Sequence, residues 1–289
     1  MRRRIILAAS SAAAMIVTSP SELTLRDDCG LAHDFKYRRR LRLIDEKRSP
    51  TLASGTAVHR VVETICGIGA GEAPTTQLLT ALAEEYLGKE FTQDDDGGGQ
   101  NVKKFLPGVV RALTRVPEWI WLAEWYVETE IVGHFTLESS VSVQLRGRPD
   151  MFRLVNDEAP SVEVVDIKTT DADPLEFVLW TPQIRMYAAC LQQAFPDRLI
   201  TYRYVCVPTA AGNKAAPASA LFVLTRKAYD NTVAEILAYA EKLKGPAMPR
   251  YARRCQWCDY APICTAVITG ADAAGITAEL YAVKGWKAE

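Results

Sequence analysis

The chain has 289 residues, of which 48% are hydrophobic and 24% are charged. This balance is ordinary for a globular protein and excludes an intrinsically disordered chain, and the length suits one large domain or two small ones. The net charge of -1 provides no overall attraction for an anionic polymer, so any binding of nucleic acid would need local basic patches.

Residues 1–18 imitate a secretory signal, because Arg2 to Arg4 precede an apolar run with small residues at Ala12 to Ala14. The chain has seven cysteines, an odd number, and three are bunched in a way that suits metal binding better than disulfides. We therefore expect a cytoplasmic protein with an N-terminal extension. The extension either precedes a true start at Met15 or packs on the domain as an apolar strand or helix. No other segment is long and apolar enough to cross a membrane.

The first predicted helix begins at Pro20, because Ser19 is a good N-cap and proline is favoured at the first helical position. A basic run with interleaved aromatic residues follows at Phe35 to Arg42. Through Arg38 to Arg42 this run would contact a nucleic-acid backbone; the alternative is a solvated helix face.

A second helix is predicted from about Ser54. It presents His59 and Glu63 on one face because the two residues are four positions apart. A lone histidine on a helix is more often packed or solvated than a metal ligand. Two more helices are predicted at about 75–91 and 102–116, on either side of an acidic, glycine-rich loop at 94–99.

The second half of the chain carries most of the strand signals. Alternating apolar residues predict strands at 125–132 and 135–145, and then a hairpin formed by 146–152 and 162–168. A helix is expected at about 175–195, followed by strands at 199–207 and 220–224 and a long helix after Thr225 to about Lys244. This order predicts an α/β fold with a mixed central β-sheet flanked by helices.

The hairpin brings three charged groups to one face. If its midpoint falls near Glu158, Asp150 lies opposite Asp166, and Lys168 points the same way because strand side chains alternate. A register slip of one residue would scatter the three groups.

Neighbouring carboxylates repel each other unless a divalent cation such as Mg²⁺ or Mn²⁺ lies between them. The alternative is an ordinary hairpin with solvated charges. Apolar residues on both faces of 162–167 instead predict a covered central strand, where charge is costly unless it serves a site.

Three cysteines, Cys255, Cys258 and Cys264, can ligate one metal centre, and Cys29 is the natural fourth ligand. Spacing alone leaves zinc and iron–sulfur equally open, and incidental cysteines are a third alternative. The remaining thiols are expected to be buried and structural: Cys66, Cys190 and Cys206.

These motifs together resemble the PD-(D/E)XK nucleases. Pro149-Asp150 with Asp166-Ile167-Lys168 is similar to their signature, His59 resembles the upstream motif of the RecB-like branch, and Gln183 with Tyr187 resembles its Gln-x-x-x-Tyr motif. A cysteine before the core and a Cys-x-x-Cys-x-x-x-x-x-Cys pattern after it resemble the iron–sulfur members. Those members include CRISPR-adaptation exonucleases and the nuclease subunits of recombination helicases.

The resemblance covers residues 19–264 and implies a restriction-endonuclease-like core with a helical insertion at about 70–120. It also implies that a cluster-binding segment at 250–264 and the N-terminal segment are joined by a cysteine metal cluster. Residues 1–18 and a C-terminal tail at 265–289 lie outside it.

The same resemblance implies a role for each matching residue. The implied ligands of Mg²⁺ or Mn²⁺ are His59, Asp150, Asp166 and the carbonyl of Ile167. Lys168 would position or activate the attacking water, and Gln183 and Tyr187 would contact DNA or brace the site. A 4Fe-4S cluster, with zinc as the alternative, would be held by Cys29, Cys255, Cys258 and Cys264.

The implied function is a metal-dependent DNA nuclease, expected to be an exonuclease that acts on single-stranded or open ends in recombination, repair or CRISPR-type processing. A non-catalytic DNA-binding adaptor subunit for a helicase or integrase is the alternative, and a zinc protein unrelated to nucleases is a third possibility. The sequence contains no helicase motif, so coupling to unwinding would require a partner chain.

Overall fold

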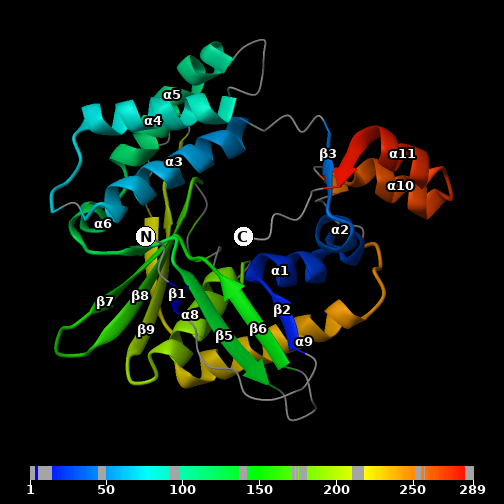
Figure 1. The fold of residues 1–289 in the computed structure, drawn as a ribbon. Helices are drawn as coiled ribbons and strands as arrows, with labels where there is room; N and C mark the ends of the chain where they lie inside the picture. The colour runs from blue at the N-terminus through cyan, green and yellow to red at the C-terminus, as the bar shows by residue number, and fades with distance from the viewer. Residues whose placement is uncertain are drawn as a thin grey trace.

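A computed structural model describes residues 4–5, 15–44, 50–69, 71–91, 98–136, 142–170, 173, 175, 181–209, 218–250, 255–256 and 258–283. Its central element is a five-stranded sheet with the strand order β10-β9-β8-β7-β4. In Figure 1 this sheet lies between one group of helices above it and another below it. No described helix is both long enough and apolar enough to span a bilayer.

The central sheet is mixed, as predicted. Its strands are β4 (Tyr126–Val127), β7 (Met151–Val155), β8 (Ser161–Lys168), β9 (Leu199–Cys206) and β10 (Ala218–Val223). Strands β8 and β9 run parallel, whereas the other neighbouring pairs are antiparallel. Strand β8 is therefore in the interior of the sheet, which explains why its sequence is apolar on both faces.

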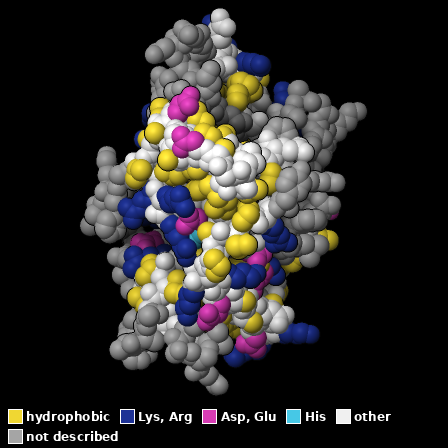
Figure 2. Space-filling view, turned by 90° about the vertical axis from the view of Figure 1, so that its right-hand side faces the viewer, with side chains coloured by type: hydrophobic (Ala, Val, Ile, Leu, Met, Phe, Trp, Pro, Cys, Tyr) yellow, Lys and Arg dark blue, Asp and Glu magenta, His cyan; other side chains and the backbone are white. Residues whose placement is uncertain are grey.

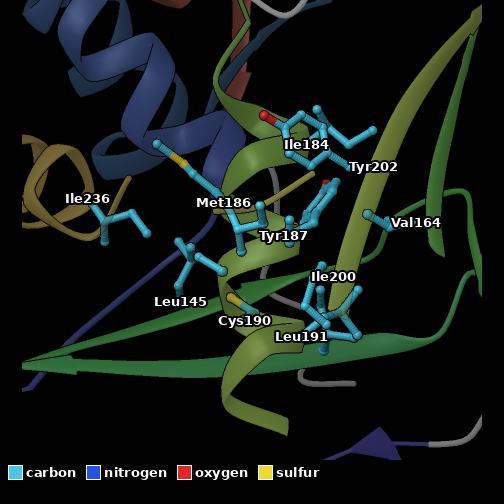
Figure 3. Close-up of a cluster of buried hydrophobic side chains, with 14 of the residues drawn as sticks. Leu145, Val164, Ile184, Met186, Tyr187, Cys190, Leu191, Ile200, Tyr202 and Ile236 are labelled. Atoms are coloured by element: carbon cyan, nitrogen blue, oxygen red, sulfur yellow. The ribbon is translucent and has the colours of Figure 1, made fainter. Parts of the chain in front are cut away.

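One face of the sheet packs on α8 (Gln183–Ala194) and α9 (Arg226–Lys244). Figure 3 shows Val164 and Ile200 of this face beside α8. A second sheet contributes Leu145 to the same hydrophobic cluster. Helix α8 thus contacts strands of both sheets, and this fixes the position of its N-terminal turn.

The second sheet has four strands in the order β1-β5-β6-β2. They are β1 (Arg4–Ile5), β2 (Met15–Thr18), β5 (Glu130–Thr136) and β6 (Ser142–Gly147). Strand β2 pairs in parallel with β6. The part of the N-terminal extension nearest the domain therefore forms the packed strand that was one of the sequence alternatives.

The opposite face of the central sheet packs on α3 (Pro50–Gly67), α4 (Thr76–Phe91) and α5 (Gly98–Thr114). Val165 and Ile167 of β8 lie in this second cluster. Strand β8 is covered on both sides, which confirms the sequence prediction. The short helix α6 (Glu118–Leu122) follows α5, and its Ile120 and Trp121 belong to the same cluster.

Several predicted boundaries are wrong. The strand predicted at 125–132 is interrupted between β4 and β5 by Glu128, whose φ is 45°. The strand predicted at 135–145 covers the last two residues of β5 and the first four residues of β6. Residues 137–141 lie outside the described residues. The last two residues of the loop predicted at 94–99 are helical, because α5 begins at Gly98, and 94–97 lie outside the described residues. Of the helix predicted at 175–195, the described part is α8, and 176–180 lie outside the described residues.

A peripheral unit is built from residues 20–43 and from the last described residues of the chain. It contains α1 (Pro20–Asp28), α2 (Gly30–His33), β3 (Leu41–Leu43), α10 (Ala261–Thr269) and α11 (Ala273–Leu280). The final strand β11 (Tyr281–Val283) pairs antiparallel with β3, and α10 and α11 stand beside β3 in Figure 1. Much of the segment expected to be a C-terminal tail is therefore folded onto the N-terminal segment.

Candidate active site

The β7–β8 hairpin has the predicted register. Met151 pairs with Val165 and Phe152 pairs with Val164, so the pairing is centred on residue 158. Asp150 precedes the first residue of β7 and Asp166 follows Val165, which places the two aspartates at the same end of the hairpin. The register prediction is confirmed.

Asp150 is held by a backbone amide and by a histidine from α3. The Ile167 N–H donates to Asp150 Oδ2 at 2.6 Å, and His59 Nδ1 lies 3.1 Å from Asp150 Oδ1. Burial acts to raise the pKa of Asp150, but the charges of His59 and Lys168 and the amide outweigh it, so the pKa lies below its ordinary value. The same contact raises the pKa of His59, although burial opposes the rise.

Asp166 and Lys168 form a second pair on the same strand. Asp166 is 3% exposed, and its Oδ2 lies 2.5 Å from Lys168 Nζ. Burial, reinforced by repulsion from Asp150, raises the pKa of Asp166 to about 6 despite the neighbouring lysine. Burial acts to lower the pKa of Lys168, but Asp166 and Asp150 prevail and raise it. Lys168 is therefore a cation at neutral pH.

A small pocket opens beside His59 and Asp150. It is lined by His59, Val62, Glu63, Glu128, Asp150, Met151 and Ile167. Glu63 is 2.5 Å from Arg60 Nη1, one turn earlier on α3. The helical face that presents His59 and Glu63 therefore faces the carboxylate end of the hairpin, as their spacing predicts.

Glu128 is a site residue that sequence reasoning missed. Its N–H donates to the carbonyl oxygen of Asp150 at 3.1 Å, and its side chain lines the pocket. Burial, then the charges of Asp150 and Glu63, raises its pKa. The left-handed φ of 45° is uncommon for a residue other than glycine and is often found at functional sites. No local pattern marks Glu128, since it falls within a run with strand character.

Gln183 and Tyr187 meet one turn apart on α8, as predicted. The Gln183 side-chain amide donates to the Tyr187 hydroxyl at 2.8 Å. Tyr187 is buried, and its ring passes so close to Gly147 that a Cβ there would lie 2.3 Å from a ring carbon. Gly147, at the end of β6, is what allows this close approach. Tyr187 is therefore packed inside the fold, whereas Gln183 is half-buried at the start of the helix.

The predicted metal ligands are partly paired with each other in this structure. His59 contacts Asp150, and Asp166 contacts Lys168. Within the described residues, no three His, Cys, Asp or Glu side chains are grouped so as to hold a metal ion. The donor chemistry nevertheless fits Mg²⁺ or Mn²⁺, since two carboxylates with repelling charges and an imidazole meet at one end of the hairpin.

The predicted cluster cysteines lie in the peripheral unit. Cys29, Cys258 and Cys264 pack against one hydrophobic cluster that contains Tyr260 and Tyr281. Burial raises the pKa of the Cys258 and Cys264 thiols, and the charges of Cys29 and Cys255 add to the rise. Cys29, Cys255, Cys258 and Cys264 are thus close enough to influence one another, although no three form a metal-holding group within the described residues.

The three other thiols are buried, as predicted. Burial raises the pKa of Cys66 and Cys190 to about 12 and that of Cys206 to about 11. Thiols with such high pKa values are protonated and unreactive at neutral pH.

The basic run forms the π-helical turn η1 (Asp34–Arg38) and the start of β3. Arg38 donates to the carbonyl oxygen of Leu243, and Arg39 Nε donates to Asp34 Oδ2 at 2.8 Å. Two of its arginines therefore make internal contacts, although both are exposed. On the face seen in Figure 2, Lys and Arg side chains are interspersed with Asp and Glu side chains. The predicted contact with DNA stays a prediction.

Comparison with known proteins gives one family match. The sequence model described as the PD-(D/E)XK nuclease superfamily matches residues 17–265. The crystal structure of the protein SSO0001 is 13% identical, covers 89% of each chain and has a TM-score of 0.38. The structure of a predicted exonuclease from Eubacterium rectale is 12% identical, covers 82% of this chain and 86% of its own, and has a TM-score of 0.49. No curated protein matches. The family match spans every residue gathered at the site.

Proposed function

Because the chain belongs to the PD-(D/E)XK nuclease superfamily, we propose that it is a metal-dependent DNA nuclease whose reaction centre is the carboxylate end of the β7–β8 hairpin. The observation that carries this proposal is the convergence of Asp150, Asp166 and Lys168 there, with His59 arriving from α3. Buried charges of this kind are costly to fold unless they serve a site.

The proposed ligands of the Mg²⁺ or Mn²⁺ ion are His59, Asp150, Asp166 and the carbonyl oxygen of Ile167. When bound, the ion would lower the pKa of a water and neutralise charge on the scissile phosphate. His59 can serve as a ligand only in its neutral form, so it must first give up the proton that Asp150 favours.

Lys168 acts as a positive charge in this scheme. Its raised pKa keeps the ammonium protonated at neutral pH, so it is not poised to remove a proton from water. It can instead orient the attacking water and stabilise negative charge that develops on the phosphate. Gln183, presented at the start of α8 and tied to the buried Tyr187, is placed to contact the DNA.

We further propose that the enzyme is an exonuclease of single-stranded or open DNA ends that works in the cytoplasm, in recombination, repair or CRISPR-type processing. The combination of the RecB-like motifs and the basic run at Arg38 to Arg42 supports this finer assignment. A helicase or integrase is the proposed partner, because unwinding would have to be supplied by another chain.

Cys29, Cys255, Cys258 and Cys264 are proposed to hold a 4Fe-4S cluster, with zinc as the alternative. The donor set fits either, since four soft thiolates suit both centres and the thiols influence one another electrostatically. The bound centre would join α1 and α2 to the start of α10.

Anaerobically purified protein should be brown and contain iron that is lost in Cys258→Ser. A colourless protein that contains stoichiometric zinc would select the alternative.

Cleavage of labelled single-stranded and double-stranded DNA tests the nuclease assignment. With Mg²⁺ or Mn²⁺, Lys168→Ala should cleave about 100-fold more slowly than wild type or worse, because it removes a charge at the reaction centre. Lys89→Ala is the matched control, since Lys89 is an exposed residue on α4. Equal rates for Lys168→Ala and Lys89→Ala would refute the assignment.

The second candidate is a non-catalytic DNA-binding adaptor. The observation that favours it is the pairing of His59 with Asp150 and of Lys168 with Asp166, because these contacts are made without a cation. Protein that binds DNA but does not cleave it with Mg²⁺ or Mn²⁺ would select this candidate. Binding of Mn²⁺ should be measured on the same preparation.

A further inference from the structure

We propose that Tyr204 is a positioning residue. It fixes the position of Lys168 relative to the first turn of α8, so that Lys168 and Gln183 act on the same phosphate. This inference rests on the proposed nuclease activity. No motif marks Tyr204, since an aromatic residue in an apolar strand is usual in a core.

Strand β9 places Tyr204 directly beside the reaction centre. In the parallel pairing of β8 and β9, Asp166 is in register with Tyr204 and Lys168 with Cys206. Because side chains alternate along a strand, Tyr204 lies on the face that also carries Asp166 and Lys168. Its side chain is 0% exposed, so its ring cannot move aside into solvent.

The ring of Tyr204 contacts the catalytic lysine. Lys168 Nζ lies 5.7 Å from the centroid of the ring, within the range of a cation–π attraction. The same ammonium is held by Asp166 at 2.5 Å. A long, flexible lysine side chain is therefore restrained by a carboxylate and by an immobile aromatic ring, which reduces the rotamers open to it.

The hydroxyl of Tyr204 contacts the start of α8. It donates to the carbonyl oxygen of Thr181 at 3.2 Å. Burial raises the pKa of Tyr204, while a hydrogen bond from the backbone of Ile184 acts in the opposite direction. The hydroxyl thus stays protonated, donates to the residue before the helix and accepts from its first turn.

This hydroxyl takes the place of a missing helix cap. The N-cap of α8 is Pro182, whose side chain makes no capping hydrogen bond. The first backbone N–H groups of a helix have no partner within it, so a bond from Ile184 to a neighbouring strand fixes the turn. Gln183 lies in that turn and donates to Tyr187 at 2.8 Å. Tyr204 therefore connects Lys168, through its ring, to the helix turn that carries Gln183, through its hydroxyl.

Tyr202 provides a matched control. It lies two residues earlier on the same strand and the same face, is also buried, and its ring stacks on Phe222 at a centroid distance of 5.4 Å. Replacing either tyrosine with phenylalanine removes one hydroxyl from this face of β9. Only the Tyr204 hydroxyl contacts Thr181 at the start of α8, so a difference between the two variants reports positioning and not a general loss of core stability.

The first test is steady-state cleavage of end-labelled DNA with Mn²⁺. Tyr204→Phe should lower kcat about three- to tenfold, because it removes the hydroxyl that contacts the start of α8, with KM unchanged. Tyr204→Leu, which also loses the ring, should lower kcat about threefold to tenfold further. Tyr202→Phe should match wild type. If Tyr204→Phe and Tyr202→Phe have the same kcat, the proposal is overturned.

A double-mutant cycle tests the connection to Gln183. If the Tyr204 hydroxyl acts by placing Gln183, adding Tyr204→Phe to Gln183→Ala should lower kcat no further than Gln183→Ala alone. Fully multiplicative losses would contradict the connection. This cycle uses the Phe variant, so it remains informative even if Tyr204→Leu fails to fold.

Amide hydrogen exchange separates this inference from the nuclease assignment. In Tyr204→Phe the Ile184 amide should exchange about three- to tenfold faster than in Tyr202→Phe, because its acceptor is gone. Unchanged exchange overturns the inference whatever the activity. If the Ile184 amide exchanges faster in Tyr204→Phe but the wild-type protein never cleaves DNA, the nuclease assignment is refuted. The contact between Tyr204 and the start of α8 would still be established.

Discussion

Lys168 Nζ lies 2.5 Å from Asp166 Oδ2, yet the pKa of Asp166 is raised to about 6. Burial and the repulsion of Asp150 therefore outweigh the attraction of the lysine. Two carboxylates held together against their repulsion are suited to bind a divalent cation.

The first prediction concerns pH and stability without metal. The folded pKa of Asp166 is about 6, above the ordinary value of about 4, so the folded state binds the proton more tightly. The Asp166 contribution to the free energy of unfolding is therefore highest at low pH and falls as pH rises through that interval. Asp166→Asn should thus gain stability relative to wild type from about pH 4 to about pH 7 in EDTA, measured by urea unfolding.

Bound metal should reverse the order of stability of wild type and Asp166→Asn. Mn²⁺ should raise the thermal midpoint of wild type at neutral pH, because it binds only the folded state, and should barely change that of Asp166→Asn. Equal increases in both proteins would show that the ion binds elsewhere.

Glu128 provides the second prediction. Its φ of 45° is strained for a residue with a Cβ, so Glu128→Gly should be about 1 kcal/mol more stable than Glu128→Gln, which removes the same charge but keeps the strain. Both variants should cleave DNA more slowly than wild type, since both lose a carboxylate that lines the pocket. Chemical denaturation and cleavage assays on the same preparations check the two claims. Full activity in both variants would remove Glu128 from the site.

The third prediction concerns Gly147. A Cβ at this position would lie 2.3 Å from the ring of Tyr187, so Gly147→Ala should displace the ring and cost about 1 to 3 kcal/mol of stability. Cleavage should also slow, because Gln183 loses its partner. Gly88→Ala is the control: it adds a Cβ in the middle of α4 with nothing within 4 Å, and should be neutral or slightly stabilising. Similar stabilities for the two variants in urea unfolding would contradict the close packing.

Arg26 provides the fourth prediction. It is buried in α1 and donates to the carbonyl oxygens of Lys242 at 2.7 Å, Gly245 at 2.9 Å and Pro246 at 2.8 Å. Arg26→Ala should cost at least about 2 kcal/mol, because three charge-assisted hydrogen bonds are lost, although the Lys242 carbonyl still accepts from the Gly245 N–H at 3.2 Å. Since Arg26 joins the helix that precedes Cys29 to residues 242–246, which precede Cys255 in the chain, iron or zinc content should also fall, as measured by elemental analysis. Retained metal content in an equally destabilised variant would limit Arg26 to a structural role.

Local signals predicted much of this structure correctly. Ser19 caps α1 and Thr225 caps α9, where each side chain accepts from an N–H of the first turn. The hairpin register followed from placing the midpoint near Glu158, between the two runs that form β7 and β8.

The missed features depend on contacts between distant segments. Glu128 reaches the site because the chain reverses at a strained residue within a run that has strand character, and no local pattern marks such a residue. The pairing of β11 with β3 joins segments that are far apart in the chain. Tyr204 acts through its contact with the start of α8, a helix that precedes it in the sequence. Periodicity describes one element at a time, so it could not supply these relationships.

The most direct test of the central claim is the rate of DNA cleavage by wild type and Asp150→Asn with Mg²⁺, with Mn²⁺ and with EDTA, using strands labelled at either end. We expect wild type to cleave with either metal, releasing short products from one end, and to be inactive in EDTA. We expect Asp150→Asn, which keeps the shape of the side chain but loses its charge, to be about 100-fold slower or worse with both metals. Cleavage that persists in EDTA, or that is unchanged in Asp150→Asn, would contradict a metal-dependent nuclease centred on the β7–β8 hairpin.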